Sequence, residues 1–443
     1  MTEQTIAAIS TPDGVGALAV VRVSGDKAIE YTNTICGKDL TKATPREAVF
    51  TKIFSLDKSH IIDEAVVLIM KNPASFTGED TVEIFCHGGR MVCRAILKEL
   101  LKTGCRMALP GEFSKRAFLN GKIDLVKAES IGEIIHSKTE KAFLAASSQL
   151  DGTLSAKIEE CRQNLILVAA HISALIDYPE EGVPDISSME VKEKTNKVIE
   201  NLTVLEKNAE NGIIMSGGLN VVIAGKPNVG KSSLLNAILN KDRAIVTDIA
   251  GTTRDILCEQ ANIGGYLINL TDTAGIRKTE DIVEAQGVER TIQGIADAHL
   301  VIILLDASNP FDEQDKKISE LTKDKKILTV YNKCDIMKSE RNTDGIYISA
   351  KKGIGIDTLC EKIAEFASNY DVNDNEIPIT NMRQQELIIR AKSILESINF
   401  EFLPIDIILC ELENAISILG EITGENVSED IIEAVFSNFC VGK

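Results

Sequence analysis

A glycine-rich stretch near the middle of the chain combines residue types and spacing that indicate chemistry. Residues 225–232 read GKPNVGKS, which fits the pattern G-x-x-x-x-G-K-S between a strand-like run and a helical pattern. The backbone N–H groups of such a loop can surround phosphates. Lys231 is placed to reach the β and γ phosphates, and the Ser232 hydroxyl is placed to bind Mg²⁺. The segment therefore predicts a nucleotide site.

Four further motifs follow in chain order, and the motif NKCD among them decides which base is bound. They are GTTRD at 251–255, DTAG at 272–275, NKCD at 332–335 and SAK at 349–351. The Asp335 carboxylate can accept two hydrogen bonds from guanine, whereas adenine would place an acceptor against it. Asp272 suits an indirect contact with Mg²⁺, and Thr253 can close over the same metal. The set predicts GTP.

The position after DTAG departs from the Ras-like pattern, in which a glutamine positions the attacking water. Here it is Ile276, which cannot orient water. Three carboxylates follow, and each is either a water-orienting group or a solvated side chain: Glu280, Asp281 and Glu284. The side-chain oxygen of Asn228, inside the phosphate loop, is placed to reach a cation beside the phosphates.

The composition excludes several classes of protein. No apolar run approaches the length of a membrane span, and the start MTEQTIAAIS lacks the pattern of a secretion signal. Ten cysteines without a CxxC pair disfavour zinc ribbons and disulfide scaffolds, which predicts reducing cytosol. A net charge of −18 disfavours broad electrostatic binding to nucleic acid. If the substrate is a nucleic acid, a molecule other than this chain would supply much of the positively charged surface that binds it.

Three sequence textures predict the domain organisation. Residues 1–120 mix strand-like runs with turns, residues 121–215 have a helical period, and residues 216–379 alternate strand and helix. Helical periodicity returns at 380–443. We expect one discontinuous helical domain, 121–215 and 380–443, with the α/β domain inserted. Two separate helical domains are the alternative.

The chain resembles the MnmE (TrmE) family of tRNA modification GTPases over essentially its whole length. The resemblance rests on VVRVSG, SFTGEDTVEIFCHGG, PGEFSKRAFLNGKIDLVKAE, DYPEEG, TDIAGTTRD and FCVGK. It implies a multidomain α+β and α/β protein. The N-terminal α+β domain would bind folate and mediate dimerisation, and a helical domain would carry an inserted Ras-like P-loop GTPase domain.

The resemblance also implies an activity, cofactors and partners. A cytoplasmic homodimer would hydrolyse GTP in a K⁺-dependent reaction with Mg²⁺. A FAD-containing partner of the MnmG (GidA) type would join it in a heterotetramer or larger complex. Together they would place an aminomethyl or carboxymethylaminomethyl group on C5 of the wobble uridine of certain tRNAs. The one-carbon unit would come from 5-formyl-tetrahydrofolate or a related folate.

The resemblance assigns roles to particular residues. It implies folate contacts at Arg22, Glu83, Lys122 and Lys443. It implies K⁺ ligands at Asn228, Thr247, Ile249 and Thr252, Mg²⁺ ligands at Ser232 and Thr253, and a water-orienting role for Glu284. With the motifs, the expected GTP contacts are Asn228, Val229, Gly230, Lys231, Ser232, Ser233, Thr247, Ile249, Thr252, Thr253, Asp272, Thr273, Ala274, Gly275, Asn332, Lys333, Asp335, Ser349, Ala350 and Lys351.

The last residues, SNFCVGK, place a lone cysteine four positions from the end. A lipidation box is one reading, but Gly442 and Lys443 do not fit it, and an unstructured tail is the other. The resemblance replaces both with a tail that reaches the folate site, with Cys440 as a reactive, catalytic thiol. His87, in CHGG, is expected to be structural.

Two other classes of protein share part of the pattern. A ribosome-assembly GTPase that binds rRNA has the same five motifs, but the acidic charge and the N-terminal domain disfavour it. A lipidated membrane switch is disfavoured by both ends of the chain, so no membrane partner is expected.

Overall fold

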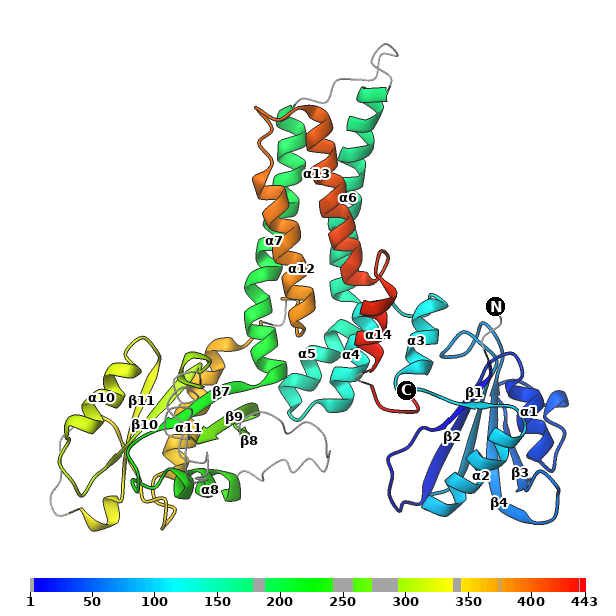
Figure 1. Ribbon diagram of the computed structural model, residues 1–443, viewed down its shortest axis with the longest axis horizontal. Helices are drawn as coiled ribbons and strands as arrows, with labels where there is room; N and C mark the ends of the chain where they lie inside the picture. The colour runs from blue at the N-terminus through cyan, green and yellow to red at the C-terminus, as the bar shows by residue number, and fades with distance from the viewer. Residues whose placement is uncertain are drawn as a thin grey trace, which may run out of the picture. The chain divides into compact units, whose positions relative to one another are not determined.

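The computed structural model describes residues 4–177, 188–241, 258–272, 294–337, 344–373, 376–437 and 439–443 (Figure 1). The chain forms two compact units, Met1–Gly132 with Ile416–Lys443, and Glu133–Ala415. Each unit has its own six-stranded sheet and hydrophobic core. No helix among these described residues has the length and apolar character that would let it cross a membrane.

The sheet of the first unit has the strand order β3-β4-β5-β2-β1-β6. Its strands are β1 (Ile6–Ile9), β2 (Leu18–Ser24), β3 (Ala48–Phe54), β4 (Ile61–Met70), β5 (Thr81–His87) and β6 (Arg106–Met107). Neighbouring strands are antiparallel except β1 and β6. Alternate residues of β2, such as Val21 and Val23, are fully buried, because successive side chains of a strand point to opposite faces.

Helices lie on both faces of this sheet. The helices of the unit are α1 (Ala28–Ile35), η1 (Leu40–Lys42), α2 (Arg90–Lys102), α3 (Glu112–Leu119), α4 (Leu125–His136, which continues into the second unit), the end of α13 (Ile405–Thr423) and α14 (Glu429–Ser437). Apolar residues of α1 and α2 pack in one core with Val21, Val23 and Ile84. On the other face, Phe113 of α3 packs with Ile6 and Ala8. The two faces therefore differ, and the predicted folate residue Arg22 lies on the face that α3 covers.

The end of the chain packs within this unit. Phe436 and Phe439 share a cluster with Leu125 and Ala128 of α4. Val441 forms an isolated bridge with Pro110. A Cβ at Gly111, which has φ of +65°, would lie 2.3 Å from the Phe436 carbonyl oxygen, so only glycine fits this crossing. The tail is held by apolar packing and backbone contacts.

The sheet of the second unit has the order β12-β11-β10-β7-β9-β8 and is parallel except for β8 with β9. Its strands are β7 (Leu219–Ala224), β8 (Cys258–Ile263), β9 (Tyr266–Asp272), β10 (Leu300–Asp306), β11 (Ile327–Asn332) and β12 (Ile346–Tyr347). The run LVIILL of β10 is buried throughout, as expected for a parallel sheet with both faces covered.

Helices cover both faces of the second sheet. They are α8 (Lys231–Lys241), α10 (Glu313–Leu321) and α11 (Ile356–Ala367), with the short turns η2 (Cys334–Ile336) and η3 (Ser368–Tyr370). α8 and α11 pack against Val221 and Ile302, whereas Ile318 of α10 packs against their neighbours Val222 and Val301.

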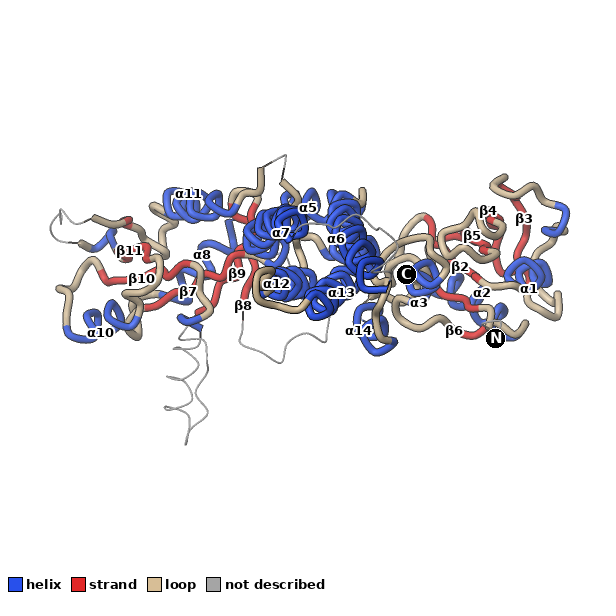
Figure 2. The backbone as a smooth tube through the Cα atoms, turned by 90° about the horizontal axis from the view of Figure 1, so that it is seen from above, coloured by secondary structure: helices blue, strands red, loops and turns tan. Residues whose placement is uncertain are grey.

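Long helices flank the α/β stretch in the sequence. They are α5 (Glu140–Leu150), α6 (Thr153–Asp177), α7 (Ser188–Gly217), α12 (Met382–Ser397) and α13 (Ile405–Thr423). α7 contacts α5, α6 and α12, and Figure 2 shows α6, α7 and α12 side by side. The chain thus leaves the bundle through α7 and returns to it through α12. The predicted boundaries at 120, 215 and 380 stay a prediction.

Candidate functional site

The predicted nucleotide residues gather at one edge of the second sheet. The phosphate loop follows β7, Asp272 ends β9, Asp306 ends β10 and Asn332 ends β11. These four strands are parallel neighbours, so their carboxyl ends meet at the same edge, where ligands of open α/β sheets bind.

Lys231 is held over the phosphate loop. Its side chain is buried, and Nζ donates hydrogen bonds to the carbonyl oxygens of Gly225 at 2.6 Å and Lys226 at 2.9 Å. Burial lowers the pKa of Lys231, and the nearby Asp272 carboxylate opposes that shift. A polyanion arriving at the loop would further favour the charged ammonium.

Ser232 and Asp272 form the part of the predicted Mg²⁺ site that lies in the described residues. Ser232 Oγ donates a hydrogen bond of 2.8 Å to Asp272 Oδ2, and Asp272 is buried. A hydroxyl and a carboxylate are the hard oxygen donors that Mg²⁺ prefers, so these residues fit that ion.

Asn332 joins the base-recognition motifs to the phosphate loop. Its Nδ2 donates to the Val229 carbonyl oxygen at 2.8 Å, and its Oδ1 accepts from the Ala350 N–H at 3.0 Å. The side chain is buried. The first residue of NKCD therefore acts as a brace between the loop at 225–232 and the SAK segment.

Lys333 lies between the loop and a carboxylate that the sequence did not single out. Its Nζ donates to the Asn228 carbonyl oxygen at 3.0 Å and to Asp306 Oδ2 at 2.8 Å. Burial alone would raise the pKa of Asp306, but hydrogen bonds from Lys333 and Ser308 lower it to about 2. Asp306 is therefore a permanent anion at neutral pH.

Asp335, the residue predicted to recognise guanine, is held as a carboxylate by its neighbours. A hydrogen bond from Ser349, aided by Lys352 with Nζ 3.3 Å from Oδ2, lowers the pKa of Asp335 despite partial desolvation. The carboxylate is ionised at neutral pH, as two hydrogen bonds from guanine require. Lys352 was not predicted as a site residue. Ser349 is buried, whereas the neighbouring Lys351 is exposed.

Two other loop residues differ in their surroundings. Asn228 is exposed and has φ of +64°, in the left-handed region that asparagine tolerates better than most residues. Lys226, which the sequence did not single out, pairs with Asp312 at 2.7 Å and Asp315 at 2.8 Å. The first turn of α10 thus anchors the loop from the side away from β9.

Many predicted site residues lie outside the described residues. They are Thr247, Ile249, Thr252, Thr253, Thr273, Ala274, Gly275, Ile276, Glu280, Asp281 and Glu284. The remaining loop positions Val229, Gly230 and Ser233 lie where the loop meets α8.

The predicted folate residues lie in the first unit. Arg22 and Glu83 are directly paired in the register of β2 and β5, and their side chains form an ion pair of 2.8 Å. The Arg22 guanidinium lies 5.7 Å from the ring centroid of Phe76 and 5.5 Å from that of Phe113. This arrangement presents a charged pair beside two aromatic rings.

The C-terminal tail lies against this pair. Arg22 Nη1 donates to the Gly442 carbonyl oxygen at 3.5 Å, and the Phe113 N–H donates to the Lys443 carbonyl oxygen at 3.2 Å. Cys440 is exposed, and its carbonyl oxygen accepts from the Gly111 N–H at 3.3 Å. Three of the four predicted folate residues are therefore brought together.

Lys122 makes its contact elsewhere, because its Nζ donates to the Pro73 carbonyl oxygen at 2.9 Å. His87 is held by Asp63, through Nδ1 at 2.7 Å and its backbone N–H at 2.8 Å. Asp63 of β4 thus gives His87 a partner, and a structural role for His87 stays a prediction.

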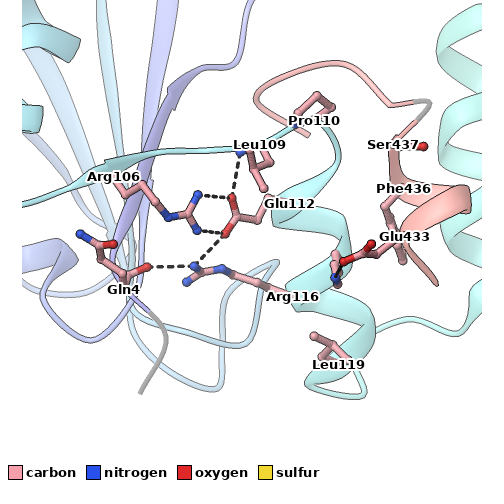
Figure 3. Close-up of a pocket in the computed structure, with 11 residues that line it drawn as sticks. Gln4, Arg106, Leu109, Pro110, Glu112, Arg116, Leu119, Glu433, Phe436 and Ser437 are labelled. Carbon is pink, nitrogen blue, oxygen red and sulfur yellow. Dashed lines mark hydrogen bonds and ion pairs between the residues drawn. The ribbon is translucent and has the colours of Figure 1, made fainter. Parts of the chain in front are cut away.

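A cavity of about 590 Å³ lies between α3 and α14 (Figure 3). The charged residues in its wall include Lys115, Glu433 and Glu112. Glu112 accepts from Arg106 at 2.9 Å and from the buried Arg116 at 3.0 Å. Burial would raise the pKa of Glu112, but these arginines lower it. The volume suits a small ligand, although its buried charges already have partners.

The phosphate loop, the NKCD and SAK segments and the parallel sheet define a guanine-nucleotide-binding protein of the P-loop class. A family described as "GTP-binding protein TrmE N-terminus" matches residues 5–122, and one described as "MnmE helical domain" matches residues 125–440.

Individual relatives match over the whole length. The tRNA modification GTPase MnmE of Acetivibrio thermocellus is 44% identical over 457 residues, covering 100% of this chain and 99% of that protein. The protein of the same name from Thermotoga maritima is 43% identical over 454 residues, covering 99% and 100%. The chain belongs to the MnmE family of tRNA modification GTPases. The predicted family and fold class are confirmed.

Among solved structures, Era of Aquifex aeolicus bound to GDP·AlF₄⁻ is 27% identical, covering 41% of this chain and 68% of that one. The TM-score of this match is 0.28.

Proposed function

We propose that this chain hydrolyses GTP as a subunit of an enzyme that modifies C5 of the wobble uridine of certain tRNAs. The observation that carries the proposal is the ionised Asp335 beside Asn332 and the phosphate loop, because this arrangement selects guanine. Membership of the MnmE family supports the tRNA-modifying role.

Hydrolysis is proposed to depend on K⁺ as well as Mg²⁺. Asn228 supports this assignment, because its exposed side chain belongs to the phosphate loop and its own carbonyl oxygen is held by Lys333. The ion would supply positive charge where phosphoryl transfer develops negative charge, as an arginine finger does. Glu284 is proposed to orient the water in place of Ile276.

A folate carrying a formyl group is proposed to bind beside Arg22 and Glu83. The aromatic rings of Phe76 and Phe113 border the guanidinium, which suits a flat heterocycle. Glu83 would accept hydrogen bonds from pterin N–H groups, and Arg22 and Lys122 would contact the carboxylates. The Lys443 carbonyl contact supports a tail that completes this site. Cys440 is proposed as the reactive thiol.

The proposed assembly is a homodimer in the cytoplasm that works with a FAD-containing partner of the MnmG type. The partner would supply redox chemistry, for which we assign no residue of this chain. The aminomethyl or carboxymethylaminomethyl product is part of the same proposal.

The proposal is tested by mass spectrometry of tRNA nucleosides. We expect cells that lack this protein to lose the modified wobble uridine. Wild-type protein should restore it, and the Asp335→Asn variant should not. The variant should also bind guanine nucleotides more weakly, because the amide has an NH2 donor in place of one of the two carboxylate oxygens that accept from guanine. Unchanged nucleosides in the deleted strain would contradict the proposal.

A further inference from the structure

Helix α2 presents a row of cations to solvent. Arg90, Arg94, Lys98 and Lys102 stand at intervals of four residues, and all four are exposed. Residues four apart lie near one another on a helix face, about 6 Å along the axis. These four side chains are called the α2 basic row below.

The opposite side of α2 is committed to the core. Cys93, Ile96 and Leu100 are buried in the cluster that α2 shares with the sheet. Because its apolar side is occupied, the helix cannot insert that side into a lipid surface. The α2 basic row can therefore bind a partner only through charge and hydrogen bonds.

Two carboxylates contact the row. Asp13 lies 3.2 Å from Arg90 and 3.5 Å from Arg94, and Glu99 lies 2.6 Å from Lys102. The Asp13 pairs are exposed on both sides and are weak because solvent screens them, whereas Glu99 is buried. An incoming anion can therefore displace Asp13 at small cost.

The charge of the chain is distributed unevenly. Residues 1–120 contain 15 Lys and Arg against 14 Asp and Glu, whereas residues 121–443 contain 33 against 52. The excess of carboxylates in residues 121–443 repels a polyanion, whereas residues 1–120 are close to neutral and do not. The α2 basic row lies in the part that tolerates it.

We propose that the α2 basic row is a docking surface for the phosphate backbone of tRNA. This inference rests on the proposed function, because it supplies the polyanion that the enzyme must hold. A regular row of arginines and lysines suits successive phosphates, and arginine can contact one phosphate through two N–H groups. Such contacts position the RNA without reading its sequence.

The test compares tRNA binding by full-length wild type and the double variant Arg94→Gln, Lys98→Gln over a range of KCl concentrations. Each lost phosphate contact should reduce the slope of log K against log salt by about 0.7–0.9. The variant should therefore lose about 1.4–1.8 in slope and bind more weakly at each concentration. Lys316→Gln with Lys317→Gln, on exposed positions of α10, is the matched control and should behave as wild type.

Each outcome decides the inference. Equal slopes for wild type and the α2 variant would overturn it while leaving the proposed function intact. A wild type that binds no tRNA, alone or with the flavoprotein partner, would overturn both. If the α2 variant instead loses binding to phosphatidylglycerol vesicles but keeps its tRNA slope, the row serves a membrane. An unchanged thermal unfolding curve should show that the variant is folded, because GTP turnover depends on residues of the other compact unit.

Discussion

Lys333 Nζ lies 2.8 Å from Asp306 Oδ2, at the carboxyl end of β10. The same ammonium donates to the Asn228 carbonyl oxygen of the phosphate loop. A carboxylate of the sheet thus fixes a lysine of NKCD against the loop. Asp306 does not belong to any of the five sequence motifs. A substitution of Asp306 therefore tests the nucleotide site without changing a motif residue.

Asp306→Asn should weaken GDP binding about tenfold, since a hydrogen bond to a charged group is worth about 1.5 kcal/mol. The pKa of Asp306 is lowered to about 2. Its contribution is therefore complete above the ordinary aspartate pKa and lost as the pH falls through the lowered value. The defect should be equal at pH 6 and pH 8 in a fluorescent-GDP titration.

Asp324→Asn, at an exposed position before β11, is the control for Asp306→Asn and should not change GDP affinity. If Asp306→Asn binds GDP as wild type does, the contact between Lys333 and Asp306 does not position the nucleotide site. A defect that grows between pH 6 and pH 8 would also contradict the mechanism.

GTP turnover should depend on K⁺ and on Glu284, because Ile276 cannot position water. In Na⁺, or in the Glu284→Ala variant, we expect kcat to fall by about 10²-fold or more, the size of a lost general-base or electrostatic contribution. GDP affinity of the Glu284→Ala variant should stay the same. Steady-state hydrolysis in matched KCl and NaCl buffers gives the measurement, and equal rates in both salts would exclude this mechanism.

Thiol reactivity should follow burial. Burial raises the pKa of Cys36 to about 12 and that of Cys161 to about 11, so both remain protonated at pH 8. Alkylation proceeds through the thiolate. Iodoacetamide at pH 8 should therefore modify the exposed Cys410 and Cys440 first, as peptide mass mapping would show. Early labelling of Cys36 in folded protein would contradict the packing of α1.

Motifs with strict local geometry were predictable from the sequence. GKPNVGKS requires a loop between strand and helix, and the structure places it between β7 and α8. The buried run of β10 was visible in the same way, because parallel strands covered on both faces are apolar throughout. Asp306 carried a signal as well, since it ends such a run and carboxyl ends of parallel strands meet at one edge.

Contacts between distant segments were not predictable in this way. The ion pair of Arg22 with Glu83 depends on the register of β2 and β5, which the chain between them sets. Lys352 reaches Asp335 only because the turn after β12 folds back toward η2. Family resemblance supplied Arg22 and Glu83, whereas nothing in the residue pattern supplied Lys352.

Deleting residues 441–443 should weaken formyl-tetrahydrofolate binding and abolish tRNA modification. The tail contributes the carbonyl contacts of Gly442 with Arg22 and of Lys443 with the Phe113 backbone. A Cβ at Gly442, which has φ of +95°, would lie 2.4 Å from the Ile9 carbonyl oxygen. Gly442→Ala should therefore weaken folate binding in the same direction, because it displaces the tail without shortening it.

GTP binding and basal hydrolysis should survive the deletion, because the nucleotide residues belong to the other compact unit. Folate affinity by calorimetry, GTP turnover and tRNA nucleoside analysis on the same preparations separate the two sites. Cys440→Ser keeps the backbone contact with Gly111 and should retain folate affinity; its loss of modification alone would mark the thiol as reactive. Unchanged folate affinity after deletion would show that the tail does not complete the site beside Arg22.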